Sequence, residues 1–233
     1  MLGYMIIIGG FTLVGMIISG KLKSTFNKYG KVALRNGMTG KDVAAAMLSH
    51  YGIHDVKIVP GRGSLTDHYN PLTKTIALSE PVYNSNSISA AAVAAHECGH
   101  AVQHATAYPL LTMRSSLVPV INFSGKIQSM LMMGFMFGLM GQGMGGGIAQ
   151  MMMWVLAATF GATALFSLVT LPVEFDASKR ALAWLDNSNI TQGAEYDGAK
   201  EALWWAAMTY VTQALSALAM FLFFLLKALG SSD

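Results

Sequence analysis

The strongest chemical signal in the sequence is the pentapeptide 96–100, His-Glu-Cys-Gly-His, which fits the H-E-x-x-H pattern of zinc-dependent hydrolases. On an α-helix, two histidines four residues apart lie within about 40° of each other around the axis, so both imidazoles can bind one ion. Glu97 lies about 60° from His100, on the flank where a metal-bound water would lie. Because zinc lowers the pKa of bound water to about 7, Glu97 can serve as the general base in peptide hydrolysis.

A pattern with three fixed positions also arises by chance, and its context decides between the two interpretations. The segment 88–106 is rich in alanine and contains no other charged residue, so burying Glu97 there is costly unless it has a role. Cys98 lies about 200° from His96, which points it away from the metal and favours a small core residue. Gly99 lies beside the ligand face, where the missing side chain can admit another helix or a substrate.

A catalytic zinc site needs a third protein ligand and an open position. His104 follows on the same helix face, but three ligands on successive turns span about 12 Å, too far for bonds near 2 Å. Glu174 follows the uncharged window 127–173 and can face the site; the alternative is a solvated acid at a helix N-terminus. Asp176 can orient a ligand histidine or cap the following helix.

The composition indicates a membrane protein. Of 233 residues, 53% are hydrophobic and 12% are charged, against about 25% charged in soluble domains. Since about 20 apolar residues cross a bilayer, the uncharged windows 2–20 and 202–226 can each span once, and 127–173 can span twice with a reversal at the glycine-rich 141–147. The first window lacks the basic start of a signal peptide, so we expect a retained anchor and four spans.

Basic residues near the spans predict the orientation. Nearly all of them fall in the two polar segments 21–126 and 172–201, and only Lys227 falls on the other side. The positive-inside rule therefore predicts a cytoplasmic face built from these segments and two extracytoplasmic termini. The expected domains are an anchor (1–20), a zincin-like domain (21–126), a transmembrane hairpin (127–171), a segment with the third ligand (172–201) and a last span (202–227). Net charge is only +3 and forms no stripe, so nucleic acid is not an expected partner.

Within the polar segment, the pattern predicts a short amphipathic helix over 39–51 and strands over 55–60 and 74–78. Ser85 and Ser87 can cap a long helix over 88–106 that carries the zinc motif. The fold class is therefore α+β, predominantly helical, with a zincin-like domain of a small sheet plus the motif helix.

Four segments resemble the neutral zinc metallopeptidases of the YugP-like type, which are bacterial membrane proteins. They are Ser64-Leu-Thr-Asp-His-Tyr-Asn-Pro71, Leu78-Ser-Glu-Pro-Val-Tyr83, 93–104 around the motif, and Leu171-Pro-Val-Glu-Phe-Asp-Ala-Ser178. The resemblance implies a gluzincin-like site with one zinc per chain, held by His96, His100 and Glu174, with Glu97 catalytic. In many gluzincins the supporting aspartate follows the ligand glutamate by a helical turn, whereas Asp176 follows Glu174 by two residues.

Zincins commonly bind substrate as an added strand at a sheet edge. The segment 74–79 is the candidate for that edge, and an ordinary structural strand is the alternative. Its candidate contact residues are Lys74, Thr75, Ile76, Ala77 and Leu78. An oxyanion needs a donor besides zinc, and four side chains qualify by type alone: His68, Tyr69, His104 and Tyr108.

These features predict a membrane-bound zinc endopeptidase in the bacterial cell membrane, acting on peptide or protein substrates that are membrane-proximal or misfolded. One alternative is an intramembrane metalloprotease, which the polar residues 85–87 before the motif helix disfavour. Another is a membrane scaffold or transporter with a structural metal, which would need four ligands in a closed site. The methionines between Met130 and Met153 could suggest Cu(I) binding, but lipid and helix packing explains them better.

Overall fold

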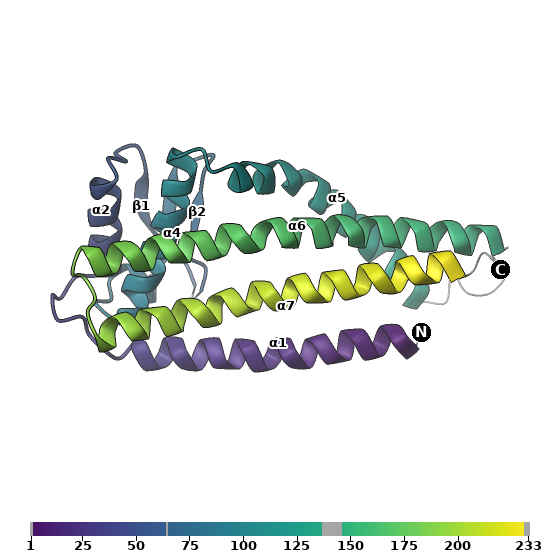
Figure 1. The fold of residues 1–233 in the computed structure, drawn as a ribbon, viewed down its shortest axis with the longest axis horizontal. Helices are drawn as coiled ribbons and strands as arrows, with labels where there is room; N and C mark the ends of the chain where they lie inside the picture. Colours follow the sequence, from purple (N-terminus) through teal and green to yellow (C-terminus); the bar gives the residue numbers. More distant parts are fainter. Residues whose placement is uncertain (1, 64, 137–145, 231–233) are drawn as a thin grey trace. The chain divides into compact units, whose positions relative to one another are not determined.

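The computed structural model describes residues 2–63, 65–136 and 146–230. In these residues the chain is predominantly helical and has one small sheet, which confirms the predominantly helical α+β part of the predicted fold class (Figure 1). The glycine-rich reversal predicted at 141–147 lies almost entirely outside the described residues. The elements are α1 (Leu2–Tyr29), α2 (Gly40–His50), β1 (Lys57–Gly61), β2 (His68–Asn70), β3 (Thr75–Ser79), α3 (Glu80–Tyr83), α4 (Ile88–Ala105), α5 (Pro109–Met136), α6 (Gly146–Asn187) and α7 (Ala194–Gly230).

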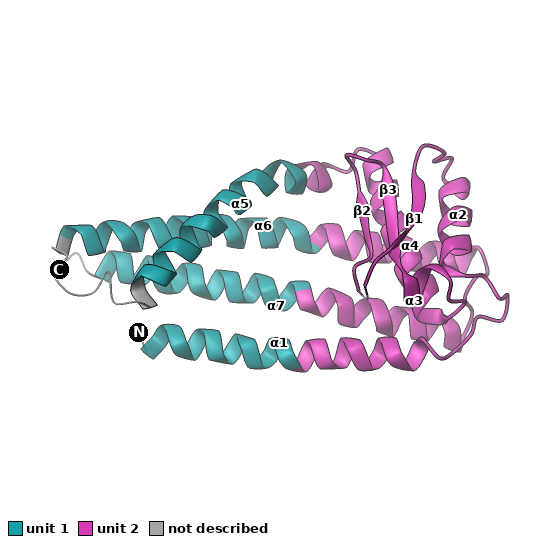
Figure 2. Cartoon of the chain, turned by 180° about the vertical axis from the view of Figure 1, so that it is seen from behind, with its two compact units in different colours: residues 1–16, 113–171, 210–233 teal, residues 17–112, 172–209 magenta. Residues whose placement is uncertain are grey.

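The chain forms two compact units, coloured separately in Figure 2. Unit 1 consists of Met1–Met16, Met113–Leu171 and Tyr210–Asp233, and unit 2 consists of Ile17–Thr112 and Pro172–Thr209. The helices α1, α6 and α7 each contribute residues to both units, so they run without a break through the domain boundaries expected near residues 20, 171 and 201.

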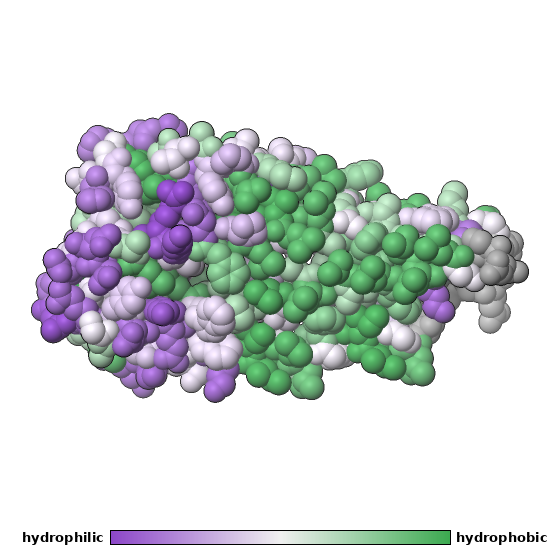
Figure 3. Space-filling view, viewed as in Figure 1, coloured by the Kyte–Doolittle hydropathy of each residue, from purple (hydrophilic) through white to green (hydrophobic). Residues whose placement is uncertain are grey.

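Unit 1 is built from apolar helices. Its core contains Leu156 and Phe224, and the ring of Phe160 stacks on Phe224 at a centroid distance of 5.2 Å. Figure 3 shows apolar side chains over the parts of α6 and α7 that belong to this unit. Among the described residues, three helices are long and apolar enough to cross a membrane: α1, α6 and α7. The fourth expected span, which begins at residue 127, runs beyond the described part of α5 and stays a prediction.

Unit 2 contains a three-stranded sheet in the order β1-β3-β2. β1 pairs in parallel with β3, placing Ile58 beside Ile76, and β2 pairs antiparallel with β3, placing Tyr69 opposite Ile76. The prediction that 74–79 is an edge strand is therefore wrong, because β3 is central and the edges are β1 and β2. The sequence pattern missed β2, whose three residues are too few for a clear alternation.

The helices α2 and α4 share the main core of unit 2 with the sheet. Val43, Met47 and Ile76 are fully buried in this core, which also includes most of α4. Thr39 begins α2 with a capping box, in which its hydroxyl accepts from the amide of Asp42 and the Asp42 carboxylate accepts from the amide of Thr39. A helix buried on nearly every face needs small apolar residues all round, which explains the alanines of α4.

Candidate metal centre

The centre forms where α4 and α6 approach each other within unit 2. Gly99 of α4 faces the backbone of α6 so closely that a Cβ atom at this position would lie 2.5 Å from the carbonyl oxygen of Ala177. Only glycine permits this distance, so the missing side chain admits a helix, one of the two options that the sequence left open. The close approach brings Glu174, one turn before Ser178 on α6, against the histidines of α4.

His96, His100 and Glu174 are the only group of three or more potential metal-ligating side chains that the described residues bring together, with ligand atoms within 4.8 Å of one another. Oε2 of Glu174 lies 3.3 Å from Nε2 of His96 and 3.5 Å from Nε2 of His100. Tetrahedral bonds of about 2.0–2.1 Å place two ligand atoms about 3.3–3.4 Å apart, so the two distances from Glu174 are close to those around a zinc ion. The two rings are nearly perpendicular, at 83°.

The three candidate ligand side chains are largely withdrawn from solvent. Glu174 is 2% exposed, whereas the side chain of His96 is 14% exposed and gives the centre its most accessible member. Burial alone would lower the pKa of His100, because it disfavours the charged ring. The Glu174 carboxylate, and more weakly that of Glu97, outweigh this effect, so the pKa of His100 is raised above its ordinary value.

Glu97 and Cys98 lie between the two histidines on α4 and have different surroundings. Glu97 is 8% exposed, contributes to the raised pKa of His100, and is not a member of the group of His96, His100 and Glu174. Cys98 is fully buried, and its Sγ donates to the carbonyl of Ala44 at 3.6 Å. Burial raises the pKa of this thiol well above its ordinary value, so it stays neutral and packs as a core residue.

Behind each histidine lies a polar side chain that the sequence reasoning missed. Oγ of Ser178 lies 3.0 Å from Nδ1 of His96, and Oε1 of Gln103 lies 3.0 Å from Nδ1 of His100. Ser178 follows Glu174 by four residues and Gln103 follows His100 by three, so helical spacing places each on the same face as its ligand neighbour. This helical spacing was the sequence signal that could have identified both residues.

Asp176 does not contact a ligand histidine. Its Oδ2 accepts from Nε2 of Gln103 at 2.8 Å and from Nε of Arg180 at 2.6 Å. Nε2 of Gln103 also donates to the carbonyl of Val173 at 2.8 Å. Asp176 therefore reaches His100 only through Gln103.

The four candidate oxyanion donors lie outside the ligand group. Nδ1 of His104 lies 2.7 Å from the hydroxyl of Tyr69, and Nδ1 of His68 lies 2.8 Å from the carbonyl of Thr66. The ring of Tyr108 lies 5.8 Å from the guanidinium of Arg180. His104 is thus paired with the edge strand β2 and is not among the grouped ligands, consistent with the spacing argument.

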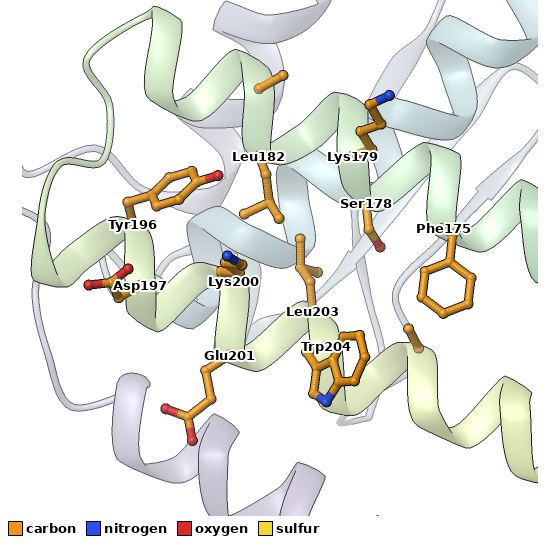
Figure 4. A pocket seen from close by; sticks show the side chains of 12 residues that line it. Phe175, Ser178, Lys179, Leu182, Tyr196, Asp197, Lys200, Glu201, Leu203 and Trp204 are labelled. Carbon is orange, nitrogen blue, oxygen red and sulfur yellow. The ribbon is translucent and has the colours of Figure 1, made fainter.

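A cavity of about 560 Å³ borders the segment around Glu174 within unit 2, between α6 and α7 (Figure 4). Ser178 lines it, and so do the apolar side chains of Phe175, Leu203 and Trp204. The hydroxyl that contacts His96 is therefore also part of a cavity wall.

The H-E-x-x-H pattern on α4 is typical of zinc-dependent hydrolases, and the buried Glu174 of α6 lies beside its two histidines. Residues 4–228 match the family described as "Putative neutral zinc metallopeptidase", and the chain belongs to that family, which confirms the resemblance. The chain is 40% identical over 217 residues to a protein of Bacillus subtilis (strain 168) named "Putative membrane protease YugP", and the alignment covers 91% of each chain. No solved structure matches the chain.

Proposed function

We propose that the protein is a membrane-bound zinc endopeptidase whose metal is held by His96, His100 and Glu174. The observation that supports the proposal is the convergence of these three side chains, from two helices, within 4.8 Å, with Glu174 at distances from both histidines close to those around a zinc ion. Three protein ligands leave one position open, which favours a catalytic site over a closed structural one. The proposal assigns one zinc ion to each chain.

In this proposal, His96, His100 and Glu174 would hold a zinc ion, which would act as a Lewis acid on a water molecule and the peptide carbonyl. Glu97 takes a proton from the attacking water and passes it to the leaving amine. Peptide hydrolysis therefore consumes one water, and the side chain of Glu97 returns to its ionised form. Its place next to His96 in the sequence, outside the ligand group, supports this role.

The proposed location is the cell membrane, with the centre at its cytoplasmic face. Three helices of the described chain can span a bilayer, and α6 carries both a candidate span and Glu174. The predicted span in α6 ends near residue 171, so Glu174 lies just beyond it. Substrates are then membrane-proximal or misfolded proteins, and the basic residues of 21–126 and 172–201 support cytoplasmic orientation.

The experiment that tests the proposal combines metal analysis with hydrolysis. Detergent-purified wild type, Glu97→Gln and Glu174→Ala are compared for zinc content and for cleavage of casein. We expect about one zinc per chain in wild type and in Glu97→Gln, cleavage only in wild type, and loss of zinc in Glu174→Ala. Zinc retained by Glu174→Ala would show that the third ligand is another residue. Cleavage by Glu97→Gln at the wild-type rate would refute the assigned base.

A further inference from the structure

Gln103 is fully buried, and its own contacts fix which way round its amide lies. The amide nitrogen is 2.8 Å from the carbonyl oxygen of Val173 and 2.8 Å from Oδ2 of Asp176. A carbonyl and an ionised carboxylate only accept hydrogen bonds, so the group facing them must be the NH₂ donor. The amide oxygen therefore faces His100.

This orientation determines the tautomer of His100. An amide oxygen can only accept, so Nδ1 of His100, 3.0 Å from Oε1 of Gln103, carries a proton and donates it. The proton on Nδ1 leaves Nε2 as the ring nitrogen that binds a metal. Nε2 is also the atom that lies 3.5 Å from Oε2 of Glu174.

Residues of α6 fix the position of the Gln103 amide. Oδ2 of Asp176 accepts from both Gln103 and Arg180, and the guanidinium of Arg180 lies over the ring of Tyr108. A continuous chain of polar contacts therefore runs from Arg180 through Asp176 and Gln103 to His100. It ties the helix that carries two of the proposed ligands to the helix that carries the third.

We propose that Gln103 is a positioning residue of the metal centre, which fixes His100 as the Nδ1–H tautomer, and that Asp176 acts on the centre only through Gln103. The inference rests on the proposed function, because it takes His100 as a zinc ligand. It replaces the expected direct contact between Asp176 and a histidine with an indirect one.

The first test is Gln103→Met, which keeps the size of the side chain and removes the acceptor. In the detergent-purified full chain, zinc affinity measured by competition with a chelator is expected to fall by about 10–100-fold, the usual effect of losing a partner of a ligand histidine. Gln128→Met is the matched control, since Gln128 donates to Thr163 in unit 1 and its loss should leave zinc affinity unchanged. In zinc-loaded protein, ¹⁵N NMR should show a protonated Nδ1 on His100 that is protected from exchange in wild type and loses protection in Gln103→Met.

The second test separates positioning from simple packing. Gln103→Glu keeps an acceptor for His100 but sets a carboxylate against that of Asp176, so zinc affinity should fall. Adding Asp176→Asn removes the repulsion between the two carboxylates, so the double variant should recover part of the lost affinity; the contact with the Val173 carbonyl stays lost. Wild-type affinity in Gln103→Met, or a double variant no better than Gln103→Glu, would overturn the inference while leaving the zinc site intact. A wild-type protein that binds no zinc would instead overturn the proposed function, and the inference with it.

Discussion

A Cβ atom at Gly99 would lie 2.5 Å from the carbonyl oxygen of Ala177, so these two residues set how closely α4 and α6 can approach. Since the proposed ligands lie on both helices, this one backbone contact also sets the distance from Glu174 to the two histidines.

Gly99→Ala is expected to push the helices apart, because the clash is with backbone and no side chain can rotate away. Overpacking of this kind costs about 1–3 kcal/mol of stability, and the displaced Glu174 should lower zinc affinity as well. Gly125→Ala is the control, because a Cβ atom there meets nothing within 4 Å in α5. Thermal unfolding and chelator competition on both variants check the prediction, which unchanged zinc binding in Gly99→Ala would contradict.

Ser178→Ala removes the oxygen that lies 3.0 Å from Nδ1 of His96 while keeping the α6 backbone. We expect about a tenfold lower zinc affinity with little change in stability, since one hydrogen bond to a ligand histidine is lost. Ser129→Ala, at an exposed position of α5, should bind zinc as tightly as wild type. Equal affinities in the two variants would show that Ser178 does not support His96.

The raised pKa of His100 predicts how zinc affinity depends on pH. A proton on Nε2 competes with the metal, so affinity is full above the pKa of His100 and falls as the pH drops through it. Burial lowers this pKa, but the carboxylates of Glu174 and Glu97 raise it further, so zinc should begin to dissociate at a higher pH than from an ordinary histidine site. Competition titrations between about pH 5 and 8 measure this midpoint.

Glu97→Gln provides an internal check on that titration. The variant removes one of the negative charges that raise the pKa of His100, so its midpoint should move to lower pH than that of wild type. A midpoint that stays in place would mean that the Glu97 charge does not reach His100.

The sequence predicted best those features that depend on local patterns. Ser87 caps α4 as expected, because a hydroxyl cap can be predicted from a few neighbouring residues. Glu174 could be proposed as a ligand because it is the first charge after a long apolar window. Its contact with His96 depends on how α4 and α6 pack against each other, which no local sequence pattern specifies.

The features that the sequence missed depend on tertiary contacts. Gln103 and Ser178 share a helix face with a ligand, but so do other residues, and only the crossing of α4 and α6 selects them. The central position of β3 was missed for the same reason, since β2 pairs with it through just three residues, His68 to Asn70. A short strand is defined by its partner more than by its own pattern.

The capping box of α2 gives a stability prediction that is independent of the metal. Thr39→Ala removes the hydroxyl that accepts from the amide of Asp42, at a cost of about 1 kcal/mol in the free energy of unfolding. Hydrogen bonds from Thr39 also lower the pKa of Asp42, so the folded state binds that proton less readily than the unfolded chain. This contribution is present above the unfolded pKa of Asp42 and is lost as the pH falls through the lowered folded value.

Chemical denaturation of wild type and Thr39→Ala at neutral and acidic pH tests this argument. The difference between the two proteins should shrink at acidic pH, where protonated Asp42 no longer completes the box. Zinc affinity should be equal in both, because α2 carries none of the proposed ligands.

The buried position of Cys98 allows the membrane orientation to be tested with single cysteines. Cys98→Ala should be well tolerated, because the thiol is fully buried and makes one weak hydrogen bond. In that background, a cysteine introduced at Pro60 of β1 is on the predicted cytoplasmic side. A reagent that cannot cross membranes should label it only after the cells are permeabilised, whereas a cysteine introduced at Gly230, just beyond the last predicted span, should be labelled in intact cells. Both positions are exposed, so accessibility within the protein does not limit either reaction. Labelling of position 60 in intact cells would place the proposed metal centre outside the cytoplasm and would exclude cytoplasmic proteins as substrates.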